Sequence, residues 1–172
     1  MASIRILLVI ICLAFVNRNA LSNCNLLDRV KLIKIAQGEL GVREVTGNND
    51  GARVEEYLAS VGLEKGDPWC AAYISWIFKK AGYPSPRTGW SPALFPGKRL
   101  VPQPAAGDVY GIYFNDLKRI AHCGLIERHH GSWIYGIEGN TNRNGSREGN
   151  GVYRKVRHIK TIKCFANWAG ER

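Results

Sequence analysis

The chain lacks several features, and each absence excludes a class of protein. The apolar run from Ile6 to Val16 is too short to cross a bilayer as a helix. There is no Cys-x-x-Cys pair, and the histidines are not spaced as zinc ligands, so we expect no metal site and no cofactor. The polar turn from Thr46 to Gly51 lacks the ligand spacing of a calcium loop, which favours a plain turn. No internal repeat is present, and 172 residues suit one domain with a real core.

Acidic residues are also scarce. The chain has 14 aspartates and glutamates against 24 lysines and arginines, which gives a formal net charge of +10. A strongly basic protein suits polyanions in general, whether nucleic acid, a membrane surface or an anionic cell wall. Charge alone does not choose between these partners.

The N-terminus has the organisation of a signal peptide. A positive segment from Met1 to Arg5 precedes the apolar run, and residues 20–22 (Ala-Leu-Ser) end in the small-x-small pattern of a cleavage site. We therefore expect a signal peptide over residues 1–22, a mature domain over residues 23–172, and a secreted or periplasmic protein. Export argues against a nucleic-acid partner. An uncleaved anchor or an ordinary first helix is less favoured, because polar residues follow the apolar run at once.

The cysteines permit disulfides in such a compartment. Cys12 lies in the predicted signal peptide, and the remaining four cysteines allow three pairings. If a bridge forms, we expect it between Cys24 and Cys164, because the two ends of a domain often meet at its surface. A lipid anchor on Cys24, with a membrane-attached protein, is an alternative.

Helical periodicity marks the first half of the chain. Apolar residues recur at helical spacing over residues 26–40, 54–61 and 70–81, and each stretch is followed by a glycine that can end a helix. In the third stretch Asp67 can cap the helix, and Pro68 suits the first helical position. That helix is apolar on most sides, so we expect it to be buried.

The second half has the patterns of strands. Helices first and strands second is typical of an α+β protein with its helices packed on an antiparallel sheet. Residues 83–104, rich in proline, are expected to cross the surface. Trp90, Leu94 and Phe95 in this segment either pack beneath it, which we favour, or line a substrate groove. The predicted strands cover residues 108–114, 120–128, 133–138, 152–159 and 161–165.

A candidate catalytic group spans both halves. Cys70 lies near a helix start, where the positive end of the helix favours a thiolate, although a buried thiol or half of a disulfide is the alternative. His122 lies within a strand, and Glu138 and Asn140 project from one face of the next strand. A thiol, an imidazole and a carboxylate or amide are the three parts of a cysteine hydrolase. Strand alternation is expected to turn Cys123 away from this group.

Four motifs resemble a known family. Pro68 to Trp76, Gly107 to Val109, His122 to Gly124 and Ile137 to Thr141 are similar, in this order, to the motifs of CHAP domains, the cysteine- and histidine-dependent amidohydrolase/peptidases. The resemblance covers most of the mature chain. It implies a papain-like α+β fold and cleavage of amide bonds in bacterial peptidoglycan. The basic, glycine-rich tract over residues 142–150 departs from the pattern of the family.

The resemblance also implies a role for each candidate residue. By position, Cys70 matches the nucleophile, His122 the base, and Glu138 the residue that orients the base, with Asn140 as a polar neighbour that some members use instead. We therefore expect a monomeric thiol hydrolase that acts on peptidoglycan as a stem-peptide endopeptidase or an N-acetylmuramoyl-L-alanine amidase. An immunity or inhibitor protein is a candidate partner.

Two other functions were weighed. The first is a catalytically inactive, basic wall-binding module of the same fold, against which the intact Cys70, His122 and Glu138 argue. The second is a nucleic-acid binder that uses a basic run more typical of a solvated strand face. That run comprises Arg143, Arg147, Arg154, Lys155 and Arg157.

Overall fold

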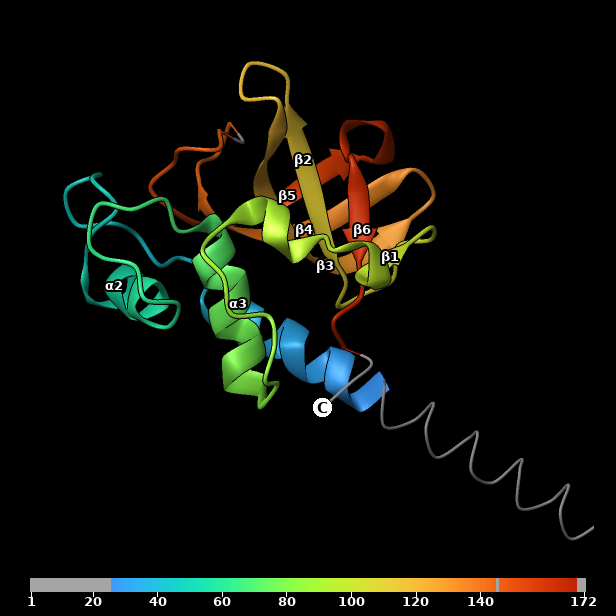
Figure 1. Cartoon of the computed structure of the whole chain (residues 1–172), viewed down its shortest axis with the longest axis horizontal. Helices are drawn as coiled ribbons and strands as arrows, with labels where there is room; N and C mark the ends of the chain where they lie inside the picture. Colours follow the sequence, from blue (N-terminus) through green and yellow to red (C-terminus); the bar gives the residue numbers. More distant parts are fainter. Residues whose placement is uncertain (1–25, 145, 170–172) are drawn as a thin grey trace, which may run out of the picture.

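The computed structural model describes residues 26–144 and 146–169. The predicted signal peptide over residues 1–22 and Cys24 lie outside these residues, so what we expect of them stays a prediction. The described chain forms helices beside a six-stranded antiparallel sheet, which confirms the predicted α+β class (Figure 1). Within the described ranges, none of the helices combines the length and the apolar character that a membrane crossing requires.

The sheet has the strand order β1-β6-β2-β3-β4-β5. The four strands from β2 to β5 pair in chain order as an antiparallel meander, and β6 returns to pair with β2. The short β1, which the sequence did not predict, pairs with β6 at the edge. The strands are β1 (Leu100–Val101), β2 (Val109–Phe114), β3 (Arg119–His130), β4 (Trp133–Thr141), β5 (Gly151–His158) and β6 (Cys164–Ala166).

The three α-helices of the described residues lie beside the sheet, and the last of them packs on its central strands. Residues 26–38 form the first helix, followed by α2 (Ala52–Ala59) and α3 (Cys70–Ala81). In Figure 1, α3 lies between α2 and the sheet, and it packs against β3 and β4. Every residue of α3 is buried except two lysines in its last turn, as its apolar sequence predicts. The helix ends at Gly82, which adopts the left-handed conformation with φ 91°.

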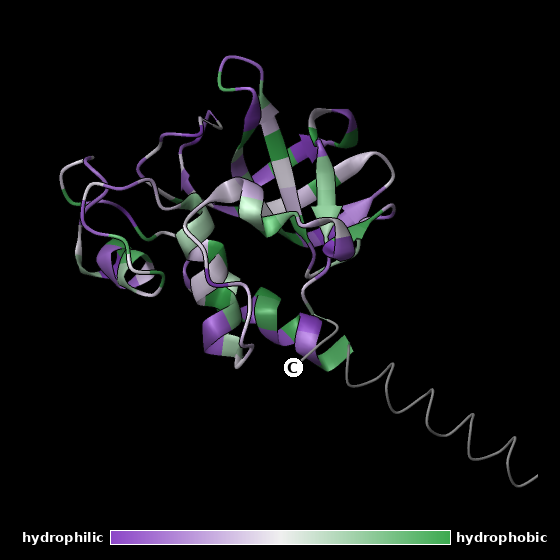
Figure 2. Ribbon diagram, in the orientation of Figure 1, coloured by the Kyte–Doolittle hydropathy of each residue, from purple (hydrophilic) through white to green (hydrophobic). Residues whose placement is uncertain are grey.

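Apolar residues gather on both faces of the sheet. Alternation along the strands places Val109, Leu125 and Ile137 in the large core beneath the helices. Figure 2 shows hydrophobic residues along α3 as well as along the inner strands. The other face carries a smaller buried cluster, formed by Tyr110, Ile126, Ile134 and Phe165. The start of α3 therefore lies against a strand layer that is closely packed on both sides.

Candidate active site

The start of α3 positions Cys70. The helix begins at Cys70 itself, with Trp69 as the N-cap residue. The predicted cap by Asp67 is wrong, because its carboxylate instead accepts a hydrogen bond from the Glu64 N–H at 3.0 Å and closes a local turn. Cys70 is consequently the first helical residue, where the unpaired N–H groups and the helix dipole favour a negative charge. Its side chain is 4% exposed.

Asn140 fixes this helix start from the neighbouring strand. In the amide orientation that satisfies both of its polar groups, its oxygen accepts from the Trp69 N–H at 3.1 Å and its nitrogen donates to the Gly149 carbonyl at 2.8 Å. The backbone of Asn140 is left-handed (φ 54°), and the register of β4 against β5 shifts between Glu138 and Thr141. Extended alternation therefore stops here, so the expectation that Glu138 and Asn140 project side by side is wrong. Asn140 holds the residue before Cys70, whereas Glu138 holds the imidazole.

His122 and Glu138 form a buried pair. The Nε2 atom of His122 lies 2.9 Å from Oε2 of Glu138, and both side chains are almost fully buried. The other ring nitrogen, Nδ1, is buried and has no hydrogen-bond partner at close range among the described residues. Burial opposes a charge on the ring, but the charge of Glu138 and the interaction with Cys70 raise the pKa of His122 to about 9.

Two further residues hold Glu138, and the sequence did not indicate either of them. The Tyr110 hydroxyl donates to Oε1 at 2.5 Å, and Arg157 donates to both carboxylate oxygens at 2.8 and 2.7 Å. Burial favours the neutral acid, but the charge of His122 and the bonds from Arg157 lower the pKa of Glu138 to about 2. Glu138 is therefore a carboxylate over the whole physiological range.

Cys70 interacts with three side chains. A hydrogen bond from Cys123, followed by the interactions with His122 and Ser91, lowers the pKa of Cys70 well below its usual value despite burial. The Ser91 hydroxyl lies 3.4 Å from the Cys70 sulfur. Thiolate and imidazolium are the forms that these interactions favour. The arrangement supplies a nucleophile, a proton donor next to it, and a carboxylate that orients the donor.

The position of Cys123 corrects a prediction. Cys123 faces the core beneath the helices, as alternation requires, but α3 packs on that same face of β3. Its thiol consequently reaches Cys70, and the prediction that it points away from the site is wrong. Burial and the neighbouring Cys70 raise the pKa of Cys123, so it remains a protonated thiol and a donor. No two of Cys70, Cys123 and Cys164 are bridged to each other, and the bridge from Cys164 to Cys24, which lies outside the described residues, stays a prediction.

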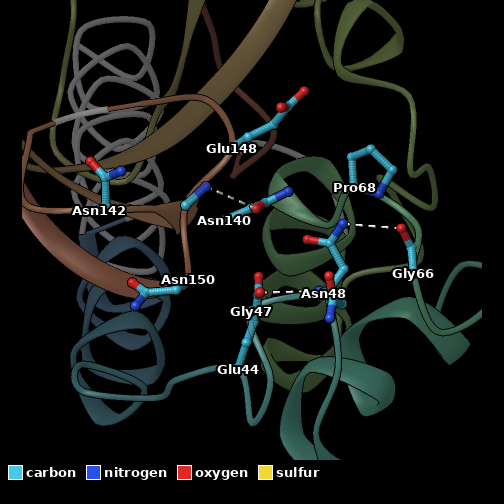
Figure 3. Close-up of a pocket in the computed structure, with 11 residues that line it drawn as sticks. Glu44, Gly47, Asn48, Gly66, Pro68, Asn140, Asn142, Glu148 and Asn150 are labelled. Carbon is cyan, nitrogen blue, oxygen red and sulfur yellow. Dashed lines mark hydrogen bonds between the residues drawn. The ribbon is translucent and has the colours of Figure 1, made fainter.

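Two cavities flank the start of α3. One, with a volume of about 470 Å³, is the groove that Cys70, Ser91 and Trp90 line. Trp90 lines this groove and is 53% exposed, so the packing that we favoured for it from the sequence is wrong. Leu94 packs in the core, as we favoured. Pro68 borders both the groove and a second cavity of about 590 Å³. Figure 3 shows that second cavity, with Asn140 and Glu148 at its wall.

The basic run makes mostly internal contacts. Arg154 pairs with Glu127, Lys155 donates to the carbonyls of Asn142 and Arg143, and Arg157 turns inward to Glu138. These contacts give three of its five side chains structural partners, which weakens the nucleic-acid hypothesis further. Among the residues in view, no group of three histidine, cysteine, aspartate or glutamate side chains is placed to hold a metal ion.

No protein-family model matches the chain, and no curated protein matches it in a sequence comparison. The geometry of the site and the resemblance of the four motifs are therefore the two indications of function.

Proposed function

We propose that this protein is a secreted cysteine amidohydrolase or peptidase of papain-like fold, which cleaves amide bonds of peptidoglycan through Cys70, His122 and Glu138. One observation carries the proposal. A thiol with a lowered pKa stands at the first residue of a buried helix, beside an imidazole whose far nitrogen lies 2.9 Å from an ionised, buried carboxylate. The same three roles recur in thiol hydrolases on unrelated folds.

Two features of the sequence, and not the catalytic geometry, support peptidoglycan as the substrate. The four motifs resemble those of CHAP domains, and the positive net charge suits an anionic cell wall. Within that class the bond is either an amide within the stem peptide or the bond between N-acetylmuramic acid and L-alanine. Both are amides, so the same residues serve either reaction.

The first half of the reaction uses the ion pair. The Cys70 thiolate attacks the amide carbonyl carbon, and a tetrahedral oxyanion forms. The N–H of Cys70, at the first position of α3, points along the helix axis with the other unpaired donors and is a donor for this oxyanion. His122 then gives a proton from Nδ1 to the leaving amine, which departs and leaves a thioester on Cys70.

The second half reverses the role of the imidazole. Neutral His122 takes a proton from a water molecule, the resulting hydroxide attacks the thioester, and the carboxylic acid leaves as the Cys70 sulfur regains its electron pair. The proton taken by His122 restores the imidazolium. Glu138 stays ionised throughout and keeps Nε2 of the ring in place.

The experiment is digestion of purified sacculi, with mass analysis of the released fragments. We expect Cys70→Ala and Cys70→Ser to lose activity by about a thousandfold or more, because neither side chain supplies a thiolate. Cys164→Ala is the control, since Cys164 lies on β6 outside the site, and its fold is checked by circular dichroism because the predicted bridge to Cys24 would be lost with it. New peptide or sugar termini identify the bond. Normal digestion by a folded Cys70→Ala protein would contradict the proposal.

A further inference from the structure

The groove at Cys70 carries an excess of positive charge. Three arginines line it, Arg87, Arg119 and Arg147, against one carboxylate, Asp67. Two of these four groups are already committed to the fold. Arg87 donates to the backbone carbonyls of Pro86, Tyr83 and Ser75, and Asp67 accepts from the Glu64 N–H.

Arg119 is the arginine best placed to bind a ligand. Its guanidinium lies over the exposed Trp90 ring at 4.2 Å, and one nitrogen donates to the Ile120 carbonyl at 3.2 Å. No carboxylate of the described residues pairs with it. A guanidinium has five N–H donors in a planar fork, so Arg119 keeps donors for a ligand. Stacking on Trp90 fixes the orientation of the guanidinium plane.

Arg147 adds a second charge from the opposite loop. It forms an ion pair with the adjacent Glu148 at 2.5 Å, and the two side chains are 29% and 64% exposed. Exposed pairs of this kind contribute little free energy, so a ligand carboxylate can compete for Arg147. Because both arginines and Cys70 line one groove, a chain bound across the thiol brings its flanking groups to these guanidinium ions.

We infer that the groove selects amide substrates that carry a free carboxylate next to the scissile bond. Arg119 is the main residue that binds this carboxylate, and Arg147 is the second. This inference rests on the proposed function for the role of Cys70 as nucleophile. A carboxylate between two guanidinium ions forms charge-assisted, bidentate hydrogen bonds, which an uncharged amide does not reproduce. In peptidoglycan terms, stem peptides with free carboxylates are preferred over amidated ones.

A first experiment compares two alkylating reagents on Cys70. Iodoacetate is an anion and iodoacetamide is its neutral counterpart, so the ratio of their rates at Cys70 reports the preference of the groove for a carboxylate. Rates are read by peptide mapping, which separates Cys70 from Cys123 and Cys164. We expect Arg119→Gln to lower the iodoacetate to iodoacetamide ratio about tenfold, as loss of a charge-assisted hydrogen bond does.

Arg128→Gln is the matched control. Arg128 lies on the same strand and also stacks on an aromatic ring, Tyr135 at 3.3 Å, but it does not line the groove. Arg128→Gln removes the same charge, and the ratio should stay within about twofold of the parent value, because Arg128 is exposed outside the groove and salt screens exposed charges that are far apart. A ratio that Arg119→Gln leaves unchanged, or that Arg128→Gln lowers equally, overturns the inference.

A second experiment needs no thiol. Cys70→Ala protein is titrated with N-acetyl-Ala-Glu-Ala-amide and with the same peptide carrying glutamine, and the Trp90 indole signal is followed by NMR. The glutamate peptide should bind at least about tenfold more tightly. Equal affinities overturn the inference. If Cys70 reacts no faster than Cys164 with either reagent, the proposed function fails, while this binding comparison still decides the preference of the groove.

Discussion

At the residue scale, the site is a row of ions of alternating sign, mostly withdrawn from water. Cys70, His122, Glu138 and Arg157 follow one another as thiolate, imidazolium, carboxylate and guanidinium. A buried ion alone is costly, but a partner of opposite sign with good hydrogen-bond geometry offsets that cost. Removing one member therefore leaves its neighbour uncompensated. The row explains why a carboxylate at 0% exposure has a pKa of about 2.

This carboxylate predicts a specific dependence of stability on acid. The folded-state pKa of Glu138 is about 2, below its usual value of 4.5, so its contribution is present above pH 4.5 and is lost as the pH falls towards 2. The difference in unfolding free energy between the parent protein and Glu138→Gln should shrink by about 2 kcal/mol between pH 5 and pH 3. Urea unfolding at each pH, followed by tryptophan fluorescence, measures it.

Asp108 is the control for this prediction. It is also a buried carboxylate bonded to an arginine, with its Oδ1 2.8 Å from Arg29, but burial raises its pKa. A carboxylate with a raised folded-state pKa stabilises the fold more as the pH falls, so the difference between the parent and Asp108→Asn should grow under the same change. A Glu138→Gln difference that is constant from pH 5 to pH 3 would show that Glu138 is not held as an ion.

At the scale of elements, glycines let the side chain of Tyr110 reach from β2 across β3 to β4. Tyr110 on β2 reaches Glu138 because β3 and β4 have glycines under its ring. A Cβ atom added at Gly124 or Gly136 would lie 2.5 or 2.4 Å from the Tyr110 hydroxyl oxygen. Neither glycine has a positive φ, so the requirement is for space and not for conformation. The strands are thus shaped around the bond that Tyr110 makes with Glu138 at 2.5 Å.

Gly136→Ala tests this requirement. The methyl group displaces Tyr110 and breaks its hydrogen bond to Glu138, so we expect a loss of about 2 kcal/mol or more in unfolding free energy, together with lower activity. Gly38→Ala, in the first helix, meets no atom within 4 Å and is the control. It should leave stability unchanged or raise it by up to about 0.5 kcal/mol, because Gly38 is the last residue of its helix and gains less than an interior position. Equal stability of the two variants would refute the account of β4.

At the scale of the whole molecule, local patterns predicted the elements but not how they meet. The apolar period of residues 70–81 and the alternation of β2 to β5 are written in neighbouring residues, so α3 and the meander were predictable. The convergence of Tyr110 and Arg157 on Glu138 depends on the pairing of separate strands, for which short stretches carry no signal. Cys70, His122 and Glu138 were predicted from the helix start, the strand pattern and the resemblance of the motifs, and their convergence follows from the fold.

Local rules also failed where two of them competed. Asp67 suits a helix cap, yet it closes a turn with Glu64, and the helix begins three residues later. The predictions for Cys123 and Asn140 failed for different reasons. The first shares its face of the sheet with α3, and the second has a left-handed backbone that ends the extended pattern. All three residues lie at or beside the start of α3, where the fold departs from regular geometry.

The most direct test of the central claim is the pH dependence of Cys70 alkylation by iodoacetamide, read by peptide mapping. We predict a reaction that is already fast at pH 6, with a midpoint well below the ordinary thiol value of about 8.5, because His122 and Cys123 lower the pKa of Cys70. His122→Ala should raise the midpoint, and Cys164, whose pKa burial raises, is the slow reference in samples in which the mapping recovers it unbridged. A Cys70 midpoint near 8.5 that His122→Ala does not change would contradict the account.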